Sequence, residues 1–155
     1  MIELDSRVKD ALIEIDFIKR YEALSNKFNN ERTPTNKRLR YFDGEIVMEI
    51  IEDVGYSIGF EPKEKFFYTE KENIEKYEFS TYLGLDSGMV EFIWNIKEGE
   101  KYILGRPIGE LSRNIISNDY RIKKPIFGTY EDLDEIFAVG YQLYEDFKKA
   151  MANQE

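Results

Sequence analysis

The sequence predicts an α+β fold, with an antiparallel sheet of four or five strands packed in two layers against N-terminal and C-terminal helices. Apolar residues recur at helical spacing near both ends of the chain and alternate with polar residues through its middle. The composition supports a real core, because 42% of the 155 residues are apolar and 15% are aromatic. This length suits one ordinary domain and nothing marks a linker, so we expect a single domain over residues 1–155.

The first expected element is a helix over residues 6–29, which Asp5 or Ser6 can cap. Its apolar side chains, all at helical spacing, are Val8, Leu12, Ile15, Ile18, Tyr21, Leu24 and Phe28. Residues 29–36 have the composition of a loop, and the short basic run that follows, 37–40, suits a solvated loop.

Residues 44–54 fit either a helix or a strand. Their Ile and Val residues favour strands, but their spacing fits a helical stripe that Gly55 could cap, and we favour the helix. Tyr56, Ile58 and Phe60 then alternate like a strand that Pro62 would end, and a second strand is expected over 66–68. Thr69 and Glu72 form a capping-box pattern, which predicts a brief helix through Tyr77 or only a charged loop.

The clearest expected element is a hairpin. Alternating apolar residues over 77–83 and again over 90–96 predict two strands, joined by the turn-rich segment 84–88. A second turn at 98–100 leads to a third strand over 102–104, which completes an antiparallel meander.

The last third of the chain predicts a short helix over 108–116, an extended stretch over 121–127 and a long final helix that Thr129 caps. The stripe of this final helix is the most regular in the chain, at Tyr130, Leu133, Phe137, Tyr141, Tyr144, Phe147 and Met151.

Two missing residue types exclude much chemistry. The chain has neither Cys nor His, so it offers no disulfide, thiol nucleophile, imidazole base or usual transition-metal site. Carboxylates at 43–53 could hold Ca²⁺ or Mg²⁺, but the ligand spacing of an EF-hand is missing and a solvated acidic helix face explains them. We therefore expect no metal, no cofactor and no enzymatic activity. An enzyme that relies on carboxylate, Tyr or Lys chemistry is the remaining alternative.

The negative charge is concentrated in the middle of the chain. The formal net charge of −9 divides into +2 for residues 1–40, −10 for 41–100 and −1 for 101–155. Such a field repels nucleic acids and anionic membranes and attracts cationic partners. Solvation alone is the simpler explanation, and a docking face for a basic protein is the sharper one.

Tyrosines lie among these carboxylates, and acidic plus aromatic side chains suit a surface that receives Lys and Arg through ion pairs and cation–π contacts. The partner-binding residues that we expect are Glu49, Glu52, Asp53, Tyr56, Glu61, Glu64, Tyr68, Glu70, Glu72 and Glu75.

In size, charge and general layout the whole chain resembles the immunity proteins of bacterial polymorphic toxin systems. The hairpin Tyr77–Ile96 and the acidic helix start Tyr130-Glu131-Asp132-Leu133-Asp134-Glu135-Ile136-Phe137 are the segments that carry the likeness. The resemblance implies a cognate, basic toxin in the same cell, neutralised by binding over or beside its active site. It assigns no role to any individual residue.

A second hypothesis is a small-molecule-binding or regulatory module, with an aromatic pocket between sheet and helices lined by Phe79, Phe92, Trp94 and Phe137. The same residues would also make an ordinary core. The acidic N-terminus lacks an apolar run, so no secretory signal and no membrane span are expected, and the predicted location is cytoplasmic.

Overall fold

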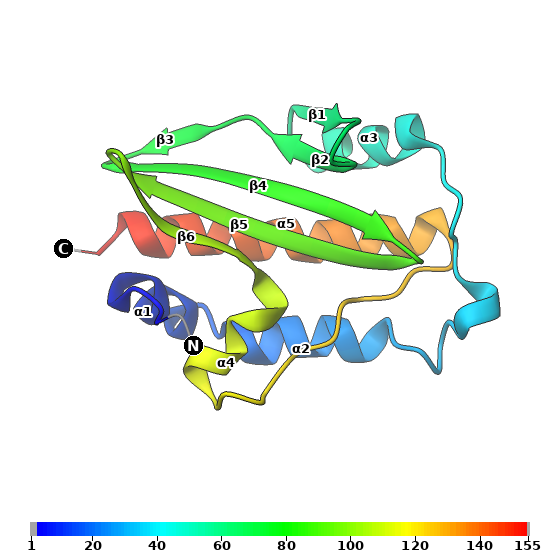
Figure 1. Cartoon of the computed structure of the whole chain (residues 1–155), viewed down its shortest axis with the longest axis horizontal. Coiled ribbons are helices and arrows are strands. Elements are labelled where there is room, and N and C mark those ends of the chain that lie inside the picture. The colour runs from blue at the N-terminus through cyan, green and yellow to red at the C-terminus, as the bar shows by residue number, and fades with distance from the viewer. Residues whose placement is uncertain (1–2, 155) are drawn as a thin grey trace.

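The computed structural model describes residues 3–154 and contains one antiparallel sheet flanked by helices, as the sequence predicts (Figure 1). Five strands lie side by side in the order β1-β2-β4-β5-β6, and β3 pairs with β4 on the same side as β2. The strands are β1 (Ile58–Glu61), β2 (Phe66–Thr69), β3 (Glu72–Ile74), β4 (Tyr77–Asp86), β5 (Met89–Glu98) and β6 (Lys101–Pro107).

The predicted hairpin is the longest pairing in the sheet. β4 and β5 pair along their whole length, from Tyr77 opposite Glu98 to Asp86 opposite Met89. Only Ser87 and Gly88 remain in the turn, and both have positive φ, as a two-residue hairpin of this twist requires. The connector predicted over 84–88 is therefore too long, because residues 84–86 belong to β4. The side chains of Phe79, Leu83, Phe92 and Trp94 alternate onto the buried face.

The helix or charged loop predicted from Thr69 and Glu72 is wrong, because residues 72–74 form strand β3. Ile74 pairs with Tyr77 across a tight turn, where Glu75 has φ of 54°. A capping-box pattern needs an apolar stripe behind it, and here too few apolar residues follow to make a helix. The free edge of β4 offers these residues hydrogen-bond partners instead.

Helix α5 (Tyr130–Ala152) covers the buried face of the sheet (Figure 1). It begins where the sequence predicts, because the Thr129 hydroxyl accepts a hydrogen bond from the Asp132 amide at 3.0 Å. Its stripe packs on the strand side chains, with Phe147 stacked on Trp94 at 4.8 Å between ring centroids. Gly140 lies so close to Phe92 that a Cβ there would overlap the ring.

The single helix predicted over 6–29 is divided in two, α1 (Ser6–Glu14) and α2 (Phe17–Lys27). Asp16 has a left-handed backbone with φ of 57°, which Asp tolerates better than most residues. The break lets both helices pack against α5. The Arg20 guanidinium fixes the junction, because it donates to the Ile15 carbonyl at 3.0 Å and to Asp146 at 2.7 Å.

The ambiguous segment 44–54 is helical, which confirms the favoured prediction. Helix α3 (Gly44–Asp53) is capped by the Asp43 carboxylate, and Gly55 follows it with φ of 103°. The helix predicted over 108–116 is shorter and divided into η2 (Ile108–Glu110) and α4 (Ser112–Ile115); η1 spans Thr35–Lys37.

The arrangement separates two flanks of the molecule. In Figure 1, α3 and strands β1–β3 lie along the upper flank, whereas α2 and the extended segment that leads into α5 lie along the lower one. Between residues 3 and 154, no helix combines the length and apolarity that crossing a bilayer requires.

Candidate functional site

The upper flank contains all ten sequence-predicted partner-binding residues. We call residues 43–75, which form α3, β1, β2, β3 and their connections, the acidic flank. It holds ten carboxylates and three lysines, a formal balance of −7. Because α3 packs against both α5 and β1, charges from separate elements share one side of the molecule.

The carboxylates of α3 form one exposed group on this flank. Glu49, Glu52 and Asp53 are exposed and form no ion pair with any residue between 3 and 154. Glu49 lies three and four positions from the other two, so the charges are neighbours on one helix surface and repel each other. Glu52 and Asp53 also lie at the C-terminal end, where the helix dipole favours cations.

The turn between β1 and β2 uses its charges structurally. The half-buried Glu61 carboxylate accepts a hydrogen bond from the Glu64 amide at 2.5 Å, and Lys65 completes the turn with φ of 58°. Tyr68, on the sheet face away from α5, lies over Gly59, where a Cβ would meet its ring. Glu64 and Tyr68 remain exposed, whereas Glu61 holds the turn.

The other end of the flank contains a pocket of about 500 Å³ built around a buried lysine. Lys148 of α5 is only 2% exposed, and its Nζ lies 2.5 Å from Glu72 Oε2 and 2.6 Å from Glu145 Oε2. Tyr56 donates its hydroxyl hydrogen to Glu145, and the ammonium lies 5.5 Å from the Tyr56 ring centroid and 4.5 Å from that of Tyr144. Two carboxylates and two rings thus enclose one cation.

In this pocket the pKa values of the two tyrosines and of Glu145 are shifted in opposite directions. Burial raises the pKa of Tyr56 and of Tyr144 far above the ordinary value, and the neighbouring Glu145 raises both further. Burial alone would also raise the pKa of Glu145, but hydrogen bonds from Lys148 and Tyr56 outweigh it and leave that pKa below its ordinary value. The tyrosines therefore stay neutral and Glu145 stays ionised at neutral pH.

This pocket separates the predicted residues into two groups. Glu72 and Tyr56 are engaged with Lys148 and Glu145, so they fasten the flank to α5. Glu70 and Glu75 are exposed and form no ion pair within the described part of the chain. The predicted residues whose carboxylates are exposed and have no ion pair among residues 3–154 are Glu49, Glu52, Asp53, Glu64, Glu70 and Glu75.

An apolar groove at the start of α3 escaped the sequence prediction. It has a volume of about 630 Å³, with Phe42, Met48, Phe60 and Phe67 along its floor and the carboxylates of Asp43 and Glu45 beside them. Phe60 is 41% exposed, and the preceding Tyr41 is 93% exposed. The signal for this groove was the Tyr41-Phe42 pair between the basic run and the acidic helix.

The second predicted site, an aromatic pocket between sheet and helices, is filled. Phe79, Trp94 and Phe137 lie in the core, and Trp94 also contacts Phe17 and Tyr144. Phe92 is buried as well, with Phe137 and Tyr141 against its ring. In the part of the chain that the structure describes, no three acidic side chains converge as a metal site.

Comparisons with known proteins give no further guide. No protein-family model, curated protein or solved structure matches this chain.

Proposed function

We propose that this chain is a non-catalytic binding protein whose acidic flank docks a basic protein. By the resemblance of the whole chain, that partner is a cognate toxin domain that the complex neutralises. The chemistry of the flank matches this role, since exposed carboxylates raise the association rate with a cationic partner and select against acidic ones.

The observation that carries the proposal is the charge pattern of α3. Glu49, Glu52 and Asp53 repel one another, and the last two oppose the helix dipole, yet no described cation neutralises them. Solubility requires surface charge, but it does not require that acidic residues lie at a helix C-terminus, where the helix dipole disfavours them. This repulsion lowers the stability of the free protein. Such a loss is expected where the charge is used for binding.

The groove beside α3 gives the partner a place to anchor. Exposed charge accelerates association, but affinity depends on a few buried apolar or aromatic contacts at the centre of an interface. Phe60 and Met48, rimmed by Asp43 and Glu45, suit the long aliphatic stem and charged head of a Lys or Arg side chain. Tyr41, which precedes the lining residue Phe42 in the sequence and is exposed, is an aromatic side chain that such an interface could bury.

The experiment compares three immobilised proteins as baits for an extract of the source cell: the wild type, a binding-site variant and a control. The binding-site variant is Glu49→Gln/Glu52→Gln/Asp53→Asn. The control neutralises three carboxylates that are exposed and lack ion pairs elsewhere in the described chain: Glu14→Gln/Glu100→Gln/Asp134→Asn. We expect a basic protein on the wild type and the control, released by salt and reduced at least about tenfold on the α3 variant.

Neutralisation is tested with the captured protein itself. Co-expression with the wild-type chain should protect cells from it, and co-expression with the α3 variant should protect less. The α3 variant should melt at the same temperature as the wild type or slightly higher, because repulsion is removed. Equal capture by the α3 variant and the control would refute the role of the acidic flank in binding. A captured protein without toxicity would refute the immunity role.

A further inference from the structure

The lower flank contains a groove whose charge is opposite to that of the protein as a whole. It lies between the start of β5 and the segment 121–126, which we call the strap, and has a volume of about 590 Å³. Hydrogen bonds hold the strap on both sides. The Ser25 hydroxyl donates to the Lys123 carbonyl at 2.6 Å, and the Ile126 amide donates to the Phe28 carbonyl at 2.8 Å. The Ile122 amide donates to the Gly109 carbonyl at 3.3 Å, and the Val90 amide donates to the Pro125 carbonyl at 2.9 Å. Lys123 and Lys124 of the strap line the groove.

The floor of this groove is apolar. Met89 and Ile126 pair in an isolated bridge, and Pro107, Ile122 and Phe92 also line the groove. A volume of about 300–1,000 Å³ with an apolar lining and a few charged groups is typical of small-molecule sites. The groove is thus large enough for an organic molecule.

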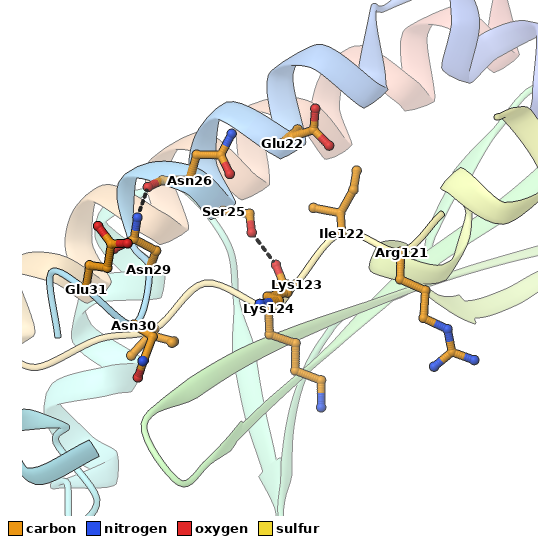
Figure 2. A pocket seen from close by; sticks show the side chains of 11 residues that line it. Glu22, Ser25, Asn26, Asn29, Asn30, Glu31, Arg121, Ile122, Lys123 and Lys124 are labelled. Carbon is orange, nitrogen blue, oxygen red and sulfur yellow. Dashed lines mark hydrogen bonds between the residues drawn. The ribbon is translucent and has the colours of Figure 1, made fainter. Parts of the chain in front are cut away.

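The rim of the groove is basic. Four cations, Arg38, Arg121, Lys123 and Lys124, line it together with two carboxylates, Glu91 and Glu110. Figure 2 shows the side chains of Arg121 and Lys124 leaving the strap on the side away from α2. Of the other grooves described above, the Lys148 pocket has more carboxylates than cations, and the α3 groove has carboxylates alone.

Several of these cations keep unused hydrogen-bonding capacity. Lys124 pairs with Glu91 at 2.9 Å, but Arg121 and Lys123 form no ion pair with residues 3–154. Arg38 donates from Nη2 to Asn30 at 2.9 Å, whereas its buried Nε finds no partner among the described side chains and backbone. A buried donor of this kind is costly unless a ligand or solvent satisfies it.

We propose that this groove binds a small organic anion, with an apolar body on the floor and a carboxylate or phosphate group held by Arg121 and Lys123. The charge complementarity is local, because the rest of the chain would repel such a ligand. Planar guanidinium groups bind both oxyanions through paired hydrogen bonds, so the head group is left to experiment. The site lies on the flank opposite to α3 and does not depend on the proposed protein partner.

The test titrates the full chain with phenyl phosphate, benzoate, inorganic phosphate and benzyl alcohol, and follows backbone amide NMR shifts. We expect phenyl phosphate or benzoate to shift residues 121–126 and 89–92, and their relative affinities identify the head group. Inorganic phosphate and benzyl alcohol should bind at least about tenfold more weakly, because each lacks one half of the ligand.

Two variants make the assignment specific. Arg121→Gln/Lys123→Gln should weaken binding at least about tenfold, while the control Lys63→Gln/Lys101→Gln, two exposed lysines without ion pairs elsewhere in the described chain, leaves it unchanged. All four residues are exposed, so each variant should keep the wild-type spectrum apart from local shifts. Equal affinity of the two variants, or shifts outside the groove for every probe, would overturn the proposal. So would equal binding of inorganic and phenyl phosphate.

Discussion

Helices α3 and α5 carry carboxylates in opposite ways. Four of the six carboxylates of α5 form ion pairs, with Asp132 3.0 Å from Arg32 and Asp146 2.7 Å from Arg20. The other two ion pairs join Glu135 to Lys27 and Glu145 to Lys148. None of the carboxylates of α3 has such a partner in residues 3–154. The charges of α5 are thus explained by the fold, whereas those of α3 need another explanation, and binding is the one that we propose.

The largest expected effect separates the buried cation from the exposed carboxylates. Glu72→Gln/Glu145→Gln leaves Lys148 buried without an ionised partner, so we expect a loss of about 3–5 kcal/mol in the free energy of unfolding. Urea denaturation measures it, with Glu49→Gln/Glu52→Gln on α3 as the control, expected within about 0.5 kcal/mol of the wild type.

A third substitution tests the cause. Adding Lys148→Met to the double variant removes the unpaired charge and should restore most of the stability. If the double variant is as stable as the α3 control, Lys148 does not depend on its two carboxylates and the distinction between the helices weakens.

A smaller effect compares packing on the two helices. Gly140→Ala on α5 places a methyl group into the Phe92 ring, so it should destabilise by about 1–3 kcal/mol although Ala favours helices. Gly44→Ala at the start of α3 meets open space and should be neutral or stabilise by up to about 1 kcal/mol. Thermal unfolding of both variants shows whether each substitution raises or lowers the stability. A neutral Gly140→Ala would mean that α5 is less tightly packed than the contacts indicate.

The smallest expected effect is the dependence of stability on pH. Hydrogen bonds from Arg20 and Gln142 outweigh burial and hold the pKa of Asp146 below its ordinary value, as Lys148 and Tyr56 do for Glu145. A lowered folded-state pKa gives stability that is complete above the unfolded-state value, near 4.5 for Glu and 3.8 for Asp, and is lost as the pH falls further.

Glu145→Gln/Asp146→Asn should therefore flatten the loss of stability below about pH 4.5, measured by urea midpoints at several pH values. The α3 variant Glu49→Gln/Glu52→Gln/Asp53→Asn should retain the wild-type slope from these two groups. An unchanged slope in the α5 variant would place the acid-sensitive groups elsewhere.

Much of the fold could be predicted because its signals are local. The alternation in 77–96 and the stripe behind Thr129 specify the hairpin and the last helix, and both are confirmed. Local signals failed where contacts with distant residues decided the secondary structure. The residues at 72–74 pair with β4 as a strand, and the helix predicted over 6–29 breaks at Asp16, so that two shorter helices contact α5.

For the candidate site, the sequence indicates where negative charge is concentrated but not which carboxylates the fold pairs. The sequence places most of the negative charge in residues 41–100, and ten of the fifteen carboxylates of this segment belong to the acidic flank. The sequence gives no sign that Glu72, and not Glu70, pairs with Lys148, which lies 76 residues further along the chain. Likewise, the sequence does not indicate that Phe60 of β1 and Met48 of α3 line a groove together.

By itself, the sequence determined the class of fold, the lack of imidazole and thiol chemistry and the sign of the middle segment, because these follow from composition and short-range periodicity. Only the tertiary structure decided which charges are free. Whether a carboxylate is paired depends on a cation that the fold brings near from a distant position, as it brings Lys148 to Glu72 and Arg20 to Asp146. The same packing leaves the carboxylates of α3 without such a cation among the residues that the structure describes.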